Sequence, residues 1–169
     1  MPEVRLETER LLLRPWRVHE APVQRELWAE RDPRVPPHRR LDADGHPSVA
    51  EIQEWIRASE PTTVGLLAVE RRQDADVVGY CGLIDTGSAE HGQAELAYEL
   101  LQRVWGHGYA TEAAGAVVAW ARSNGLARLT ASVWDWNAAS LRVLEKLGFT
   151  ELGREESTYG TNLLTGMDL

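Results

Sequence analysis

The chain has 169 residues, of which 43% are hydrophobic and 26% charged, and its formal net charge at pH 7 is −8. This length suits a single domain, residues 1–169, whose core needs neither a metal nor disulfides. The acidic balance excludes a nucleic-acid-binding surface, which needs clustered Lys and Arg, and the apolar runs are too short for a membrane span.

The first part of the chain predicts a strand, a helix and a long loop. Segment 9–16 contains the apolar run Leu11-Leu12-Leu13 before a proline, which is typical of a strand. Residues 19–30 place apolar side chains at helical spacing until Asp32-Pro33 stops the pattern. Segment 31–47 carries four prolines, a glycine and many charges, so we expect a surface loop, and long loops are often functional.

A second helix and three strands in series come next. Ser48 is a suitable cap for a helix over 48–59, because Glu51 lies three positions on as in a capping box. Pro61 closes this helix. Alternating or β-branched-rich apolar residues then predict three strands, the first two joined as a hairpin, over 62–70, 77–86 and 93–100.

The single cysteine, Cys81, lies in the second of these strands. It cannot form a disulfide within the chain, and a thiol in an apolar run is typical of a small core residue. No amino-terminal segment combines a basic start, an apolar stretch and a small-residue cleavage site. We therefore expect a soluble, unprocessed protein of the cytoplasm.

The second half of the chain continues the alternation of helices and strands. Helical spacing and glycine stop signals indicate a helix over 109–124, a strand over 128–134, a helix over 137–147, and two final strands within 149–169. The helices end at Gly125 and Gly148, and the last two strands turn near Gly160. The whole order predicts an α/β domain with a mixed sheet.

The turn between strand 93–100 and helix 109–124 reads Trp-Gly-His-Gly-Tyr-Ala-Thr-Glu-Ala over residues 105–113. Gly106 and Gly108 let the backbone approach an anion, and the first amides of the helix have no partner inside the helix. Together they indicate a cradle for a pyrophosphate. An ordinary strand-to-helix turn also needs flexible residues, so both interpretations stay open at this point.

A second segment decides between them. Asn137 and Ser140, taken alone, are a helix cap and a polar residue on a helix. The glycine turn, a strand, this Asn-x-x-Ser pair and the Lys-Leu-Gly-Phe ending at 146–149 together resemble the Gcn5-related N-acetyltransferase (GNAT) superfamily over nearly the whole chain. The segment Glu-Arg-Leu-Leu-Leu-Arg-Pro at 9–15 is similar to the branch that includes ribosomal-protein alanine and serine N-terminal acetyltransferases.

The resemblance implies a fold, a cosubstrate and a class of acceptor. It implies a single α/β (α+β) domain with a mixed, V-split sheet flanked by helices, in which acetyl-coenzyme A lies between strands 93–100 and 128–134. The acceptor would be a primary amine, either a protein N-terminus or a small molecule, and no metal is implied. Relatives are often dimers, so a homodimer is open.

The resemblance also assigns residues to the coenzyme. The pyrophosphate would lie on the backbone amides of Gly106, His107, Gly108, Tyr109, Ala110 and Thr111. Glu99 and Leu100 would offer backbone groups to the pantetheine arm, and Asn137 and Ser140 would bracket the thioester end.

Two registers of the family's phosphate motif compete, Arg103 with Gly106 and Gly108, or Trp105 with Gly108 and Ala110. We prefer the second because it aligns the start of the helix. Trp105 then stands where relatives carry Gln or Arg, and Arg103 is a nearby phosphate ligand.

The chemistry needs a base, because an alkylamine with a pKa of about 10 is mostly protonated at neutral pH. Glu95 is our candidate, directly or through water, since it lies on the strand beside the cleft. A solvated charge on the strand face is the alternative interpretation of Glu95. Glu99 and Glu90 are held in reserve, and Ser132 stands where some relatives carry a glutamate.

The oxyanion needs an aimed donor, in this family commonly a backbone amide, here around residues 98–100. The departing thiolate also needs a proton. Many relatives use a tyrosine seven residues after the Asn, where this chain has Leu144. Ser140 is the hydroxyl that remains at a matching position, so we assign it that role.

Five of the seven tryptophans fall into two groups. We expect Trp55 and Trp120 in the core, and Trp28, Trp134 and Trp136 near the acceptor cleft. Loop 31–47 would close a pocket around a small amine, whereas a protein N-terminus needs an open groove. A non-catalytic coenzyme A-binding sensor or scaffold is the alternative function, and a P-loop nucleotide site is disfavoured because no Gly-Lys-Ser/Thr follows the glycines.

Overall fold

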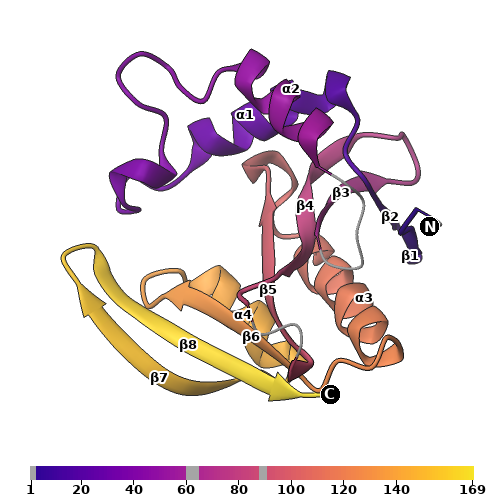
Figure 1. Cartoon of the computed structure of the whole chain (residues 1–169), viewed down its shortest axis with the longest axis vertical. Helices are drawn as coiled ribbons and strands as arrows, with labels where there is room; N and C mark the ends of the chain where they lie inside the picture. Colours follow the sequence, from indigo (N-terminus) through magenta and orange to yellow (C-terminus); the bar gives the residue numbers. More distant parts are fainter. Residues whose placement is uncertain (1–2, 60–64, 88–90) are drawn as a thin grey trace.

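The structure is a computed structural model that describes residues 3–59, 65–87 and 91–169. Its strands are β1 (Leu6–Glu7), β2 (Leu11–Arg14), β3 (Leu66–Arg71), β4 (Val77–Ile84), β5 (Gln93–Leu100), β6 (Arg128–Trp134), β7 (Thr150–Ser157) and β8 (Gly160–Asp168). Its α-helices are α1 (Ala21–Glu30), α2 (Val49–Ala58), α3 (Tyr109–Ser123) and α4 (Ala138–Leu147). The strands form one mixed sheet in the order β1-β2-β3-β4-β5-β6-β8-β7 (Figure 1).

The sheet opens between β5 and β6, its parallel pair. These strands pair at three positions only, the last being Glu95 with Thr130. Beyond that point β5 stays paired with β4 up to Leu100, and β6 stays paired with β8 up to Trp134. The two strands therefore part towards their carboxyl ends, which is the V-split that the family resemblance implies. We call this opening the split.

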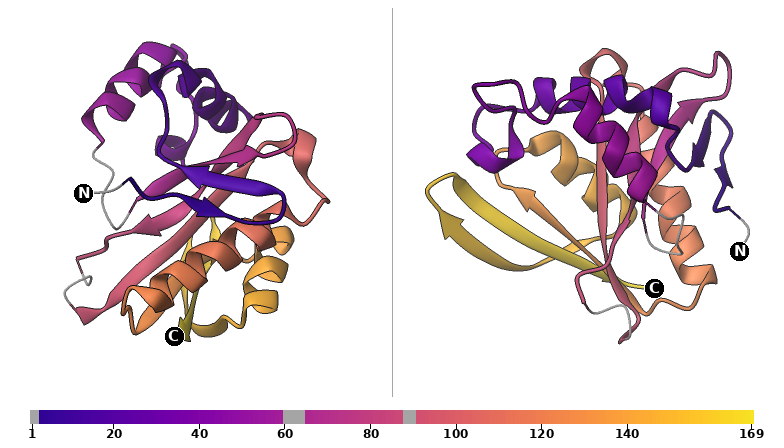
Figure 2. Two further views of the ribbon diagram at one scale, coloured as in Figure 1. Left: turned by 90° about the vertical axis from the view of Figure 1, so that its right-hand side faces the viewer. Right: turned by 45° about the horizontal axis from the view of Figure 1, so that its top comes forward.

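Helices cover both faces of the sheet (Figure 2). The helices α1 and α2 lie together on one side, and α3 and α4 lie on the other. The face of α3 that packs on the sheet is made of small apolar residues, Ala113, Ala114, Val117, Val118 and Ala121. Cys81 on β4 is fully buried in the same core, as predicted.

Most predicted elements are confirmed, with local differences at their ends. Ser48 caps α2 through its Oγ, which accepts from Glu51 N at 3.2 Å, and Glu51 Oε2 accepts from Ser48 N at 2.6 Å. The predicted stop at Pro61 and the start of the strand 62–70 lie outside the described residues. The strand predicted over 77–86 ends earlier, at Ile84.

Two details were not foreseen. The two-residue strand β1 pairs with β2 at the edge of the sheet, and it is too short to show a pattern in the sequence. The prediction that Trp55 is a core residue is wrong, because its side chain is 48% exposed and lies tilted against Trp28, with ring centroids 6.4 Å apart. Trp120 does pack against the core.

None of the helices in the described ranges is long and apolar enough to cross a membrane.

Candidate active site

The glycine turn between β5 and α3 presents a set of unused backbone donors. Gly106 and Gly108 have φ values of 81° and 79°, in the left-handed region that favours glycine. Gly108 caps α3 without a side-chain hydrogen bond. Within the described residues, the amides of 106–111 have no hydrogen-bond acceptor. Free amides at the positive end of a helix fit an anionic group such as a pyrophosphate, and a Cβ added at Gly106 would meet only open space.

An ion pair from the amino-terminal part of the chain holds this turn in place. Glu112, in the first turn of α3, accepts from Thr8 Oγ1 at 2.7 Å, from Arg10 Nε at 2.7 Å and from Arg10 N at 2.9 Å. Arg10 Nη1 also donates to the carbonyl of His107 at 2.9 Å, and its guanidinium lies over the Tyr109 ring. We call Arg10 and Glu112 the loop clamp.

The loop clamp also sets the charge beside the turn. Burial raises the pKa of Glu112, but the hydrogen bonds from Thr8 and Arg10 outweigh it, so this pKa lies below its ordinary value. Glu112 is therefore ionised at neutral pH, and Arg10 neutralises it at 2.6 Å. An anion bound on the neighbouring amides meets no unpaired negative charge from this residue.

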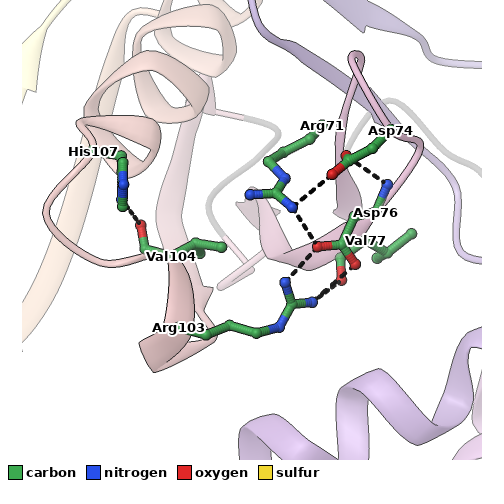
Figure 3. A network of polar contacts seen from close by, with 7 residues as sticks. All are labelled: Arg71, Asp74, Asp76, Val77, Arg103, Val104 and His107. Carbon is green, nitrogen blue, oxygen red and sulfur yellow. Dashed lines mark hydrogen bonds and ion pairs between the residues drawn. The ribbon is translucent and has the colours of Figure 1, made fainter.

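Arg103 points away from the turn and towards Asp76, which lies beside Asp74 (Figure 3). Its guanidinium contacts the Asp76 carboxylate, with Nη2 2.9 Å from Oδ1, and Asp76 also accepts from Arg71 at 3.0 Å. The hydrogen bond from Arg103 lowers the pKa of Asp76. A contact between Arg103 and a phosphate would thus require Arg103 to exchange Asp76 for the new partner.

The two aromatic residues of the turn are bound to backbone carbonyls. Trp105 Nε1 donates to the carbonyl of Leu100 at 2.8 Å, while its side chain stays 60% exposed. His107 Nδ1 lies 3.1 Å from the carbonyl of Val104 and 3.0 Å from that of Trp105. Because both partners can only accept, this nitrogen carries the hydrogen. These contacts fix the start of the turn to the end of β5.

The backbone of β5 has free groups on the side of the split. Leu101 N donates to Val78 O on β4 at 2.8 Å. Because hydrogen-bonded pairs alternate along an antiparallel ladder, Glu99 is directed to Tyr80 of β4. The amides of Tyr98 and Leu100 therefore face the split, whereas the backbone groups of Glu99 do not.

The first turn of α4 lies across the split from β5. Asn137 caps this helix, since its Oδ1 accepts from Ser140 N at 3.2 Å, and its side-chain NH₂ keeps two donors. The hydroxyl of Tyr98 donates to the Ser140 carbonyl at 3.1 Å. Burial raises the pKa of Tyr98 well above its ordinary value, so its hydroxyl keeps its proton. Ser140 and Tyr98 thus bring two hydroxyls to the same helix end.

The opposite face of β5 carries carboxylates and faces α1. Glu99 accepts from Arg31, with Nη2 3.0 Å and Nε 3.1 Å away, and from Tyr80 Oη at 3.0 Å. Glu95 lies four residues earlier on the same face. Burial raises the pKa of the Glu95 carboxyl, and the positive charge of Arg39 acts in the opposite direction. Of the reserve bases, Glu99 is engaged by Arg31, and Glu90 lies outside the described residues.

The loop after α1 runs across the end of the split. We call residues 31–40 the strap. Arg31 lies 4.0 Å over the Trp28 ring and donates through Nη1 to the Arg39 carbonyl at 2.9 Å. Arg34 lies 4.3 Å over the ring of Trp136, which stacks on Trp134 of β6. The three tryptophans expected near the acceptor thus adjoin the strap or its contacts.

Sequence reasoning did not predict the pairing of Arg10 with Glu112 or the hydrogen bond of the Tyr98 hydroxyl. Arg10 and Glu112 lie inside the two segments that carry the resemblance, but no local pattern pairs positions so far apart. Tyr98 lies among apolar residues on the inner face of its strand. A phenol hydroxyl in such a place needs a hydrogen-bond partner, and this need is the signal that could have singled out Tyr98. Within the described ranges, no group of three or more His, Cys, Asp or Glu side chains is placed to hold a metal.

Comparison with known proteins agrees with this arrangement. Residues 10–150 match a family model described as an acetyltransferase (GNAT) domain. The uncharacterized N-acetyltransferase p20 of Bacillus licheniformis is 28% identical over 155 residues, covering 88% of this chain and 83% of that protein.

Two solved structures share the fold. A GNAT-family acetyltransferase from Bacillus anthracis has a TM-score of 0.80 at 17% identity, covering 98% of each chain. A ribosomal-protein-S5-alanine acetyltransferase from Vibrio fischeri has a TM-score of 0.72 at 17% identity, covering 98% of this chain and 96% of that one. Because the family model spans most of the sequence and the sheet has the matching V-split, the chain belongs to the GNAT family of acetyltransferases.

Proposed function

We propose that this acetyltransferase transfers the acetyl group of acetyl-coenzyme A to a primary amine by direct attack in a ternary complex. The observation that carries the proposal is the arrangement around the split. Backbone amides at the end of β5 point into the split, α4 lies on one face of this strand, and a partly buried carboxylate, Glu95, lies on the other. Donor and acceptor can therefore approach from opposite faces and meet where β5 and β6 part.

The coenzyme side is formed mainly by backbone groups. The amides of 106–111 would bind the pyrophosphate, and the outward amide of Leu100 would bind the pantetheine arm in the manner of an added strand. The free NH₂ group of Asn137 would donate near the thioester end. Acetyl-coenzyme A supplies an activated acetyl thioester, and these residues hold it in register with the acceptor.

Glu95 would remove the proton that a primary ammonium carries at neutral pH, directly or through one water. The freed amine nitrogen then forms a bond to the thioester carbonyl carbon. Burial suits Glu95 to this role, because a raised pKa brings a carboxylate nearer to the pH at which it has to accept a proton. In the described part of the chain, no arginine forms an ion pair with Glu95, whereas Arg31 binds Glu99 on the same strand.

The charge that develops on the carbonyl oxygen needs a fixed donor, and the amide of Tyr98, which points into the split, would provide one. As the carbon–sulfur bond breaks, the thiolate needs a proton. Ser140 would supply it from the first turn of α4, with the proton returning from solvent, and Tyr98 is the second hydroxyl at that position.

The test is thiol release from acetyl-coenzyme A in the presence of amino acids, polyamines, aminoglycosides and short peptides that begin with Ala or Ser. We expect amine-dependent thiol release, reduced about a hundredfold by Glu95→Gln. The matched control is Glu155→Gln, because Glu155 is an exposed carboxylate on the edge strand β7, which β8 separates from β6. Tight coenzyme A binding without release from any acceptor would instead favour the non-catalytic sensor.

A further inference from the structure

The strap, residues 31–40, joins the two strands that border the split. At one end Arg31 binds Glu99 on β5 at 3.0 Å. Further along, Arg34 lies over Trp136, which follows β6. The strap therefore crosses the end of the split on the face that carries Glu95, where the acceptor would enter.

Half of the strap's arginines are already neutralised. Arg31 is paired with Glu99, and Arg34 is paired with Asp32 at 2.8 Å. In the described part of the chain, Arg39 and Arg40 form no ion pair with a carboxylate. The Nε of Arg40 is buried without a hydrogen-bond partner. A buried Nε without an acceptor is costly, and the rest of this half-buried side chain, with the exposed Arg39 beside it, leaves positive charge at this end of the strap for an incoming anion.

The strap brings the unpaired Arg39 to the side of β5 that carries the proposed base. The Arg39 carbonyl is held by Arg31, which in turn holds Glu99, and Glu95 lies four residues before Glu99 on the same face of β5. Burial raises the pKa of Glu95, while the charge of Arg39 acts against it, which places that guanidinium within electrostatic reach of the carboxylate. A carboxylate base and an arginine without a carboxylate partner thus lie on the same side of β5, where the strap crosses the split.

We propose that the acceptor is an amine that also bears a carboxylate, with Arg39 and Arg40 binding the carboxylate while Glu95 receives the proton of the amine. This rests on the proposed function. A polyamine or aminoglycoside would bring further positive charges next to two unpaired arginines, which disfavours it. The carboxylate can come from a free amino acid or from an acidic residue near a peptide N-terminus, and these sources share the same chemistry.

Matched acceptors separate the two sources. Alanine and serine are compared with their amides, the peptide Ser-Glu-Gly-amide is compared with Ser-Gln-Gly-amide, and spermidine represents the polyamines. We expect kcat/KM to be about tenfold higher for the carboxylate-bearing member of at least one pair, as a charge-assisted hydrogen bond predicts. The pair that shows the difference identifies the source. Equal rates within both pairs, or a preference for spermidine, would overturn the inference.

Substitutions connect the preference to the strap. Arg39→Ala should raise KM for the preferred acceptor about tenfold, leave the amide unaffected and keep KM for acetyl-coenzyme A, with Arg39→Lys retaining part of the preference. Arg57→Ala is the control, because Arg57 is an exposed arginine of α2 paired with Glu54. If the preference survives Arg39→Ala and Arg40→Ala, the assignment to the strap is wrong. If none of the acceptors gives thiol release, the proposed function itself is contradicted, and this inference falls with it.

Discussion

The hydroxyl of Tyr98 on β5 donates to the backbone carbonyl of Ser140 on α4 at 3.1 Å, so one hydrogen bond spans the split from strand to helix. It places the Tyr98 hydroxyl at the first turn of α4, which also carries the hydroxyl of Ser140, the proposed proton donor to the leaving thiolate. The two residues differ in what their loss should do, and this difference tests the assignment.

Ser140→Ala should lower kcat about a hundredfold with little change in KM for acetyl-coenzyme A, because it removes the proposed proton donor. Tyr98→Phe keeps the ring but loses the hydrogen bond between β5 and α4, which is worth about 1 kcal/mol. This variant should therefore mainly raise KM for acetyl-coenzyme A. Steady-state kinetics of both variants measure this. The reverse pattern would transfer the acid role to Tyr98.

The loop clamp should act on coenzyme binding and not on chemistry. Glu112→Gln removes the charge that holds Arg10, so the glycine turn should lose its fixed position and KM for acetyl-coenzyme A should rise about tenfold. We expect kcat to change little. Arg10→Lys keeps the charge but not the paired contacts. Its KM for acetyl-coenzyme A should therefore lie between those of Arg10→Ala and the wild type.

The control for the loop clamp is Glu54→Gln, because Glu54 is an exposed carboxylate on α2. A drop in kcat at unchanged KM for Glu112→Gln would show that the clamp positions reacting groups instead of the turn.

The pH profile should report Glu95. Burial raises the pKa of this carboxyl above the ordinary 4.5, so the base is protonated and inactive at pH values where an ordinary glutamate is already ionised. As pH rises through the raised pKa, Glu95 loses its proton and kcat/KM should increase. Glu95→Gln should abolish this acidic limb and leave a low, flatter profile. An unchanged limb in that variant would assign it to another group.

A buried ion pair should dominate the stability of the amino-terminal strands. Arg14 on β2 has a side chain 3% exposed and binds Glu20 at 2.6 Å and Glu70 of β3 at 2.6 Å. Arg14→Ala leaves both carboxylates without their partner, so the free energy of unfolding should fall by about 3–5 kcal/mol. Urea unfolding at pH 7 measures the loss. Arg122→Ala, at an exposed position of α3, should change it by less than about 0.5 kcal/mol.

The sequence could predict what depends on neighbours along the chain. The Ser48 and Asn137 caps, the glycine turn and the Gly148 stop are local signals, and each forms as predicted. The V-split followed from the resemblance, since no local pattern distinguishes a parted pair of strands from a paired one.

What could not be predicted depends on contacts between distant segments. Arg103 is a suitable phosphate ligand by position, yet the structure pairs it with Asp76, 27 residues away in sequence. Trp55 lies on an apolar stripe of α2, yet the face it shares with Trp28 is open to solvent. The charge pattern of the strap becomes meaningful only when the fold shows which arginines already have carboxylate partners.

The most direct measurement is a single turnover with enzyme loaded with acetyl-labelled coenzyme, with and without the preferred amine. The account predicts that thiol is released only when the amine is present, that all label appears on the amine, and that one acetyl group is transferred per thiol. Release without amine, with label on the protein, would contradict direct transfer in a ternary complex.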